Sequence, residues 1–127
     1  MIPEANTVYV VEDDRSLRNA VRRLLSSAKY RVLTFASAEE FYLSDYTSCP
    51  GCLLLDISLP GISGFELQER LIASGVKMPV IFITGQDRAG MEERAMRLGA
   101  SAYLRKPVDE QTLLGAIHLA MKSYTIV

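Results

Sequence analysis

Five short apolar runs alternate along the chain with longer amphipathic or polar segments, and this alternation restricts the possible folds most strongly. The first run, residues 8–11, is rich in β-branched and aromatic side chains, which is typical of a strand buried on both faces. The other runs are residues 30–35, 52–55, 80–83 and 102–104. Strands and helices in this order predict a parallel sheet with helices on both faces. We therefore expect an α/β fold with a doubly wound, five-stranded parallel sheet.

The segments between the apolar runs carry helix signals. Asp14 is a candidate N-cap, and the apolar positions from Leu17 to Ala28 step by three and four residues, as on one buried helix face. Ser37 and Glu40 have the spacing of a capping box at the start of a second helix. The remaining helices are expected near residues 65–73, 91–98 and 109–123.

The size and charge of the chain exclude several classes of protein. Its 127 residues fit one domain, since domains most often have about 100–150 residues, and 49% hydrophobic residues can fill a core. The 14 basic and 15 acidic residues argue against a surface that coats nucleic acid. No segment has the roughly 20 apolar residues that cross a bilayer, and residues 1–6 lack a signal-peptide pattern. We expect a single cytoplasmic domain over residues 1–127, without a membrane partner.

Cys49 and Cys52 form a Cys-Pro-Gly-Cys motif that is compatible with a redox pair or a zinc site. A redox pair usually lies where a strand leads into a helix, whereas this motif leads into an apolar run. A structural zinc site needs four ligands, and the chain has no second cysteine pair and a single histidine, His118. The favoured interpretation is that one cysteine lies in a loop and the other begins a strand.

Polar residues suited to metal and phosphate chemistry follow four of the predicted strands. They are Glu12, Asp13, Asp14, Asp56, Thr84 and Lys106. In doubly wound sheets, ligands bind in a crevice at the carboxyl ends of the strands, where these side chains would meet. Carboxylates in one crevice repel one another unless a cation joins them, and oxygen ligands suit Mg²⁺. The pattern therefore predicts a metal-assisted phosphoryl-transfer site.

Each of these residues has a simpler explanation when it is considered alone. Acidic residues after a strand often cap a helix, and a lysine before a proline is usually a solvated loop residue. The register of the first strand also matters: if it ends at Val11, Glu12 and Asp13 face the crevice and Asp14 caps the helix. Only the joint placement of these residues at successive strand ends favours a functional site.

The order of these motifs resembles the receiver domain of response regulators in two-component signalling systems. The resemblance covers residues 8–123, and residues 56–64 are similar to the Asp-x-x-Met-Pro-x-x-x-Gly loop of that family, with Leu59 replacing the methionine. Residues 83–85 and 106–107 are similar to the branch that carries a helix-turn-helix output domain, as in nitrogen-fixation and aromatic-catabolism regulators. The resemblance implies a flavodoxin-like (βα)5 fold with strand order 2-1-3-4-5.

The resemblance also implies a set of metal ligands around a phosphorylated aspartate. Asp56 would be the phosphoacceptor and a metal ligand, Asp13 would bind Mg²⁺ or Mn²⁺ directly, and Glu12 would bind it through water. The backbone carbonyl of Ser58 would complete the metal site. Glu12 departs from the family pattern, in which aspartate is more common, and its extra methylene brings the carboxylate closer to the metal or past it.

The remaining site residues would read the phosphorylation state. By resemblance, Thr84 would hydrogen-bond one phosphoryl oxygen and Lys106 would pair with another. Tyr103 would be the aromatic residue that turns inward when Thr84 moves. Pro107 resembles the cis-proline of the family, which sets the direction of the lysine before it.

The partners implied by the resemblance are a sensor histidine kinase and a transcriptional output. DNA would be contacted only through an output domain that is not in this chain. The helix near residues 91–98, the fifth strand and the last helix correspond to the usual signalling and dimerisation face, so a homodimer that forms on phosphorylation is a hypothesis.

Two rival functions stay open at this point. An aspartate-nucleophile phosphohydrolase would need a second aspartate two residues after its nucleophile, where this chain has Ser58. Without a general acid or base, hydrolysis of the acyl phosphate should be slow, so we expect self-phosphorylation with slow dephosphorylation rather than turnover. A pseudo-receiver, which binds partners but is never phosphorylated, is the other rival. A nucleotide-binding module would need a glycine-rich phosphate loop, which the chain lacks.

Overall fold

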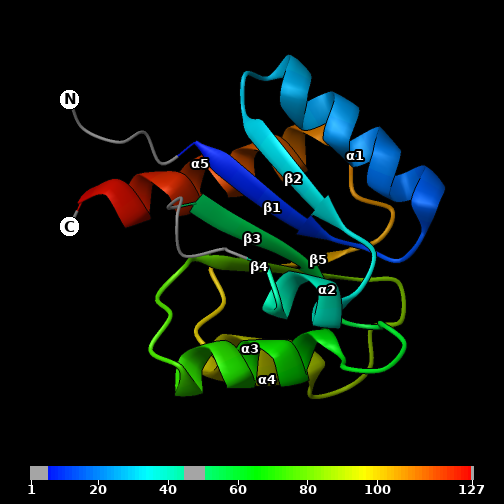
Figure 1. The fold of residues 1–127 in the computed structure, drawn as a ribbon, viewed down its shortest axis with the longest axis vertical. Helices are drawn as coiled ribbons and strands as arrows, with labels where there is room; N and C mark the ends of the chain where they lie inside the picture. The colour runs from blue at the N-terminus through cyan, green and yellow to red at the C-terminus, as the bar shows by residue number, and fades with distance from the viewer. Residues whose placement is uncertain (1–5, 45–50, 127) are drawn as a thin grey trace.

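The computed structural model describes residues 6–44 and 51–126 and shows one parallel sheet between two layers of helices (Figure 1). The strands are β1 (Thr7–Val11), β2 (Arg31–Phe35), β3 (Gly51–Asp56), β4 (Val80–Thr84) and β5 (Ala102–Arg105). The helices are α1 (Arg15–Ser27), α2 (Ala38–Tyr42), α3 (Gly64–Ala73), α4 (Met91–Arg97) and α5 (Glu110–Ile126). None of these described helices combines the length and the apolar composition needed to cross a membrane.

The strands pair in the order β2-β1-β3-β4-β5, and every pair is parallel. This confirms the predicted fold class and strand order. Val11, the last residue of β1, lies opposite Leu55 in β3, so the residues that follow them, Glu12 and Asp56, emerge side by side. All strands run in the same direction, so their carboxyl ends lie along one edge of the sheet.

The sheet is buried on both faces, which explains why its strands are apolar without alternation. On one face, Phe41 of α2 and Phe65 of α3 pack in a cluster that includes Phe82 of β4. On the other face, Leu25 of α1 and Ile117 of α5 pack against a second cluster. Figure 1 shows the corresponding layers, with α1 and α5 on one side of the sheet and α2, α3 and α4 on the other.

The ends of the helices follow the predictions in part. Asp14 is the N-cap of α1, as expected, because its carboxylate accepts a hydrogen bond from Leu17 N at 3.2 Å. Ser37 caps α2, but Glu40 accepts from Ala36 N instead of completing the predicted capping box with Ser37. A complete capping box occurs instead at the start of α3, where Ser63 and Glu66 bond each other's backbone.

Cys52 is fully buried in β3 and is not in a disulfide. Burial raises the pKa of its thiol to about 12, so the thiolate that redox chemistry requires does not form near neutral pH. Cys49 lies outside the described residues. The interpretation of Cys52 as a strand residue is confirmed.

Candidate functional site

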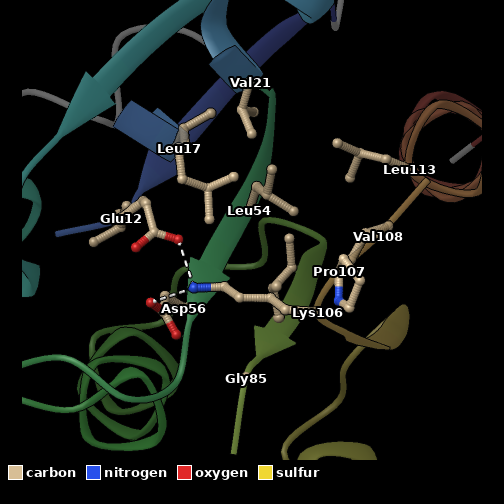
Figure 2. A pocket seen from close by; sticks show the side chains of 13 residues that line it. Glu12, Leu17, Val21, Leu54, Asp56, Gly85, Lys106, Pro107, Val108 and Leu113 are labelled. Atoms are coloured by element: carbon tan, nitrogen blue, oxygen red, sulfur yellow. Dashed lines mark hydrogen bonds and ion pairs between the residues drawn. The ribbon is translucent and has the colours of Figure 1, made fainter. Parts of the chain in front are cut away.

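Glu12, Asp56 and Lys106 are in direct contact at the carboxyl edge of the sheet. The Nζ of Lys106 lies 2.9 Å from Glu12 Oε1 and 3.1 Å from Asp56 Oδ2 (Figure 2). Both acidic residues are buried, at 5% and 4% exposure, whereas a quarter of the Lys106 side chain reaches solvent. Two buried carboxylates therefore share one ammonium group.

Asp13 brings a third carboxylate to the same place. Glu12, Asp13 and Asp56 each offer one oxygen, and these oxygens all lie within 4.8 Å of one another. Asp13 is exposed, so the cluster can be reached from solvent. Three carboxylates and one ammonium leave excess negative charge, and hard oxygen donors in this arrangement fit a divalent cation such as Mg²⁺. The residues present can therefore hold a metal ion.

The acidic segment after β1 is held by backbone contacts that the sequence did not reveal. Arg18, on the first turns of α1, donates from Nη1 to the carbonyl oxygens of Glu12 at 2.9 Å and Asp13 at 3.4 Å. The second oxygen of Glu12, Oε2, accepts from Asp14 N at 3.1 Å. Glu12 N in turn donates to Phe35 O at the end of β2. The position of Glu12 is thus fixed from both sides, and Arg18 was not predicted as a site residue.

A cavity of about 400 Å³ opens beside the three contacting residues, between β1, β3, α1 and the start of α5 (Figure 2). Most of its lining is apolar, from Leu17, Val21, Leu54, Val108 and Leu113 among others. Apolar surroundings disfavour an ionised carboxylate, since they remove its hydration.

The pKa values of Glu12 and Lys106 depend on the opposing effects of burial and of their contact with each other. Burial raises the pKa of Glu12; the hydrogen bonds from Lys106 and Asp14 N oppose the rise, and the charge of Asp56 adds to it. Burial acts to lower the pKa of Lys106, but its hydrogen bond with Glu12 and the charge of Asp56 outweigh burial and raise it. Lys106 therefore stays cationic and holds the two carboxylates together.

The loop that follows Asp56 turns tightly around its carboxylate. Ser58 N donates to Asp56 Oδ1 at 3.1 Å, so the backbone of Ser58 lies next to the cluster. Gly64 N donates to Ile57 O at 3.0 Å, and a Cβ at Gly64 would lie 2.5 Å from the carbonyl oxygen of Asp56. Glycine is therefore required where the loop returns to start α3. The metal-ligand role of the Ser58 carbonyl stays a prediction.

Thr84 and Lys106 are linked through the backbone at the ends of β4 and β5. Lys106 N donates to Thr84 O at 2.8 Å, and the peptide bond between Lys106 and Pro107 is cis, as expected. The Thr84 side chain is fully buried, and its hydroxyl accepts from Gln86 N at 3.0 Å. Thr84 thus lies at the same edge as the carboxylates, with its hydroxyl engaged by the turn after β4.

Tyr103 belongs to a polar cluster that sequence reasoning missed. Its hydroxyl donates to Asp87 Oδ1, and Arg105 donates from Nε to Asp87 Oδ2 at 2.7 Å. Arg105 also bonds Glu92 of α4 at 2.8 Å and lies over the Tyr103 ring, 5.3 Å from its centre. The cluster connects the loop after β4, the first turn of α4 and β5. Alternation along β5 could have indicated that Tyr103 and Arg105 share a face, but the partners on the loop could not be identified from spacing.

The hydrogen bond between Tyr103 and Asp87 contributes to a shift in the pKa of each residue. Burial, followed by the hydrogen bond to Asp87 and its charge, raises the pKa of Tyr103 to about 12. The bonds from Arg105 and Tyr103 lower the pKa of Asp87. Because the folded-state pKa of Tyr103 lies above the unfolded value of about 10, its contribution to stability is complete below pH of about 10 and is lost as the pH rises towards about 12.

Replacing Asp87 with asparagine is expected to lower the pKa of Tyr103 towards the ordinary phenol value of about 10, because the negative charge is removed. The pKa is measured from the ring-carbon NMR resonance of Tyr103 during an alkaline titration. Asp109→Asn is the matched control, since Asp109 caps α5 through Thr112 and belongs to another contact. An unchanged Tyr103 titration in Asp87→Asn would show that Asp87 is not its partner in solution.

Comparison with known proteins places these observations in a family. The model of the response regulator receiver domain matches residues 8–118. The transcriptional regulatory protein TdiR of Thauera aromatica is 38% identical over 117 residues, and nodulation protein W of Bradyrhizobium diazoefficiens is 42% identical over 117 residues. The alignments cover 92% and 90% of this chain but 52% of each relative. The chain thus spans about half the length of these curated relatives.

Solved structures show the same architecture. The response regulator StyR matches with a TM-score of 0.87 and 44% identity, over 92% of this chain and 59% of that chain. The FixJ-N structure matches with a TM-score of 0.83 and 31% identity, over 91% of this chain and 93% of that chain. A CheY-like receiver domain from Methanospirillum hungatei matches with a TM-score of 0.84 and 28% identity, over 93% and 94%. These matches confirm the flavodoxin-like fold.

Proposed function

Because the chain belongs to the response regulator receiver domain family, we propose that it is a Mg²⁺-dependent switch that accepts a phosphoryl group on Asp56 from a sensor histidine kinase. The observation that carries this proposal is the buried Asp56 carboxylate, which contacts Lys106 and lies within metal-sharing distance of Glu12 and Asp13. An acidic nucleophile beside an ammonium group and a divalent-cation site is suited to phosphoryl transfer.

The transfer forms one bond and breaks one bond. An oxygen of Asp56 attacks phosphorus, the phosphorus–nitrogen bond of the phosphohistidine breaks, and the electron pair stays on the imidazole nitrogen. Glu12, Asp13, Asp56 and the Ser58 carbonyl would hold Mg²⁺, or Mn²⁺ in its place, which would supply positive charge for the incoming phosphoryl oxygens. The ammonium of Lys106 leaves its bond to Asp56 and pairs with a phosphoryl oxygen.

Thr84 and Tyr103 are proposed to convert this chemistry into a conformational signal. The new acyl phosphate carries about two negative charges, and the Thr84 hydroxyl donates a hydrogen bond to one of its oxygens. Moving an equilibrium from mostly off to mostly on takes about 5.5 kcal/mol of differential binding. Charge-assisted hydrogen bonds of about 1.5–3 kcal/mol each, from Thr84 and Lys106, supply about 3–6 kcal/mol together, which reaches this value at the upper end of the range. Tyr103 follows Thr84 and changes its contact with Asp87.

The output of the switch is proposed to be transcription. TdiR is named a transcriptional regulatory protein, and the part of it that this chain does not match leaves room for an output domain. We propose that DNA is contacted through such a domain, that the protein works in the cytoplasm, and that phosphorylation favours a homodimer through α4, β5 and α5. Light scattering of the unmodified and phosphorylated forms tests the dimer. An unchanged molecular mass after phosphorylation would disprove it.

The rate of phosphate release distinguishes the switch from its rivals. With a small-molecule donor such as acetyl phosphate and Mg²⁺, release of inorganic phosphate is expected to be slow after the protein is labelled, since Ser58 cannot serve as the general acid that a phosphohydrolase has at this position. The measurement is a time course of free phosphate at several protein concentrations. Fast release at a steady rate would support the phosphohydrolase, and neither label nor release would support a pseudo-receiver.

A further inference from the structure

We propose that Glu39, on α2, is a positioning residue for the loop between β3 and α3, and that through this loop it sets the affinity of the candidate metal site. This inference rests on the proposed function, because the loop carries the Ser58 carbonyl that is proposed as a metal ligand. Glu39 lies 17 residues before Asp56 in the sequence and has no place in the roles described above.

Both ends of the loop are fixed by contacts of their own. At its start, Ile57 N donates to Ile83 O at 3.0 Å, which extends the pairing of β3 with β4. At its end, Ser63 begins α3 with the capping box, and Gly64 N bonds back to Ile57 O. The conformation of the residues between these ends therefore depends on what holds the middle of the loop.

The Glu39 side chain holds that middle part. Its Oε2 accepts a hydrogen bond from Ile62 N at 3.1 Å, across 23 positions of sequence. Gly61 has a φ of +74°, and a Cβ added there would overlap the same Oε2. The carboxylate thus lies directly against the loop backbone at Gly61 and Ile62. Ile62 in turn packs on the core cluster that contains Phe41 of α2.

The second oxygen of Glu39 shows that burying this carboxylate has an energetic cost. Among the described residues, Glu39 Oε1 is a buried side-chain atom without a hydrogen-bond partner. Leaving a polar atom buried and unpaired is unfavourable, and an apolar side chain would fill the space without that penalty. The bond to Ile62 N offsets part of this penalty and explains why an oxygen acceptor is favourable at this position.

The link to the metal site runs along four residues of backbone. Ser58 lies between the fixed start of the loop and the Glu39 contact, and its N already bonds Asp56 Oδ1. Leu59 N, in the same peptide unit as the Ser58 carbonyl, donates to Ile57 O at 3.0 Å, so this unit is held on its N-terminal side. Releasing Gly61 and Ile62 removes the support on its C-terminal side, so the carbonyl faces the carboxylates in fewer conformations. Groups that orient a metal ligand without touching the metal typically change its affinity by about 10- to 100-fold.

The experiment compares Mg²⁺ affinity in the full chain by isothermal titration calorimetry. Glu39→Ala is expected to weaken Mg²⁺ binding by about tenfold, the lower end of the range for groups outside the ligand shell. Glu40→Ala is the matched control, since it removes a carboxylate from the same helix but one that bonds Ala36 N. Glu39→Gln keeps an oxygen acceptor for Ile62 N and is expected to restore most of the affinity.

The outcomes separate this inference from the proposed function. If wild type binds Mg²⁺ and the affinity of Glu39→Ala for Mg²⁺ is within about twofold of the wild-type affinity, the role of Glu39 is disproved while the metal site stands. The reason is that losses from groups outside the ligand shell start near about tenfold. If wild type binds no Mg²⁺, the metal site itself fails and this inference fails with it. If Glu39→Ala does not fold, as judged by circular dichroism, Glu39→Leu takes its place, since it fills the space without offering an acceptor to Ile62 N and must also weaken Mg²⁺ binding.

Discussion

Replacing Asp56 with asparagine is expected to abolish phosphoryl incorporation, the largest functional effect that the site predicts. The amide has no ionised oxygen to attack phosphorus, and it also removes one of the three carboxylates that can share a cation. The shape of the side chain is nearly unchanged, so the fold is expected to persist. The measurement is the phosphoryl content of the protein after treatment with acetyl phosphate and Mg²⁺.

Asp14→Asn is the matched control for this experiment. Asp14 is two residues from Glu12 but serves as the N-cap of α1, a role that asparagine also fills. Asp14→Asn is therefore expected to be labelled like wild type. Label that persists in Asp56→Asn would assign the phosphoacceptor to another residue, and loss of label in both variants would indicate a general effect of charge.

Replacing Lys106 with methionine is expected to lower the free energy of unfolding by about 3 kcal/mol in the presence of EDTA. Removing one partner of a buried ion pair costs about 3–5 kcal/mol, and the lower end applies because a quarter of the Lys106 side chain is exposed. Glu12 and Asp56 would then face each other without a cation. Urea denaturation measures the change, and added Mg²⁺ is expected to restore part of the stability because it takes over the missing positive charge.

Lys77→Met provides the comparison for Lys106→Met. Lys77 is exposed in the segment between α3 and β4, so the same substitution there is expected to change stability by less than about 0.5 kcal/mol. Equal stability of Lys106→Met and wild type would contradict the account of Lys106 as the charge that balances the two carboxylates.

The fold could be predicted because its strongest determinants are local in the sequence. Residues 8–11 and 80–83 are apolar without alternation since both faces of the sheet are covered, and that pattern is visible in a single chain. The order of the strands was predicted through the family resemblance, because apolar runs do not encode which strands are neighbours. The convergence of Glu12, Asp56 and Lys106 followed from the parallel direction of the strands.

The contacts around the site could not be predicted in the same way. Arg18, Glu39 and Arg105 look like solvated charges in the sequence, and each finds its partner only through loop conformation. The capping box expected at Glu40 shows the same limit, because its carboxylate reaches Ala36 N instead. Positions at strand ends are set by the sheet, whereas side-chain partners across loops depend on geometry that residue spacing does not contain.

The central claim is that Asp56 accepts a phosphoryl group with the help of a divalent cation, and intact-mass measurement of the wild-type protein tests it most directly. After incubation with acetyl phosphate and Mg²⁺, a single phosphoryl adduct is expected, and the adduct should be absent when EDTA replaces Mg²⁺. An unmodified mass under both conditions, or an adduct that forms equally well with EDTA, would contradict the account.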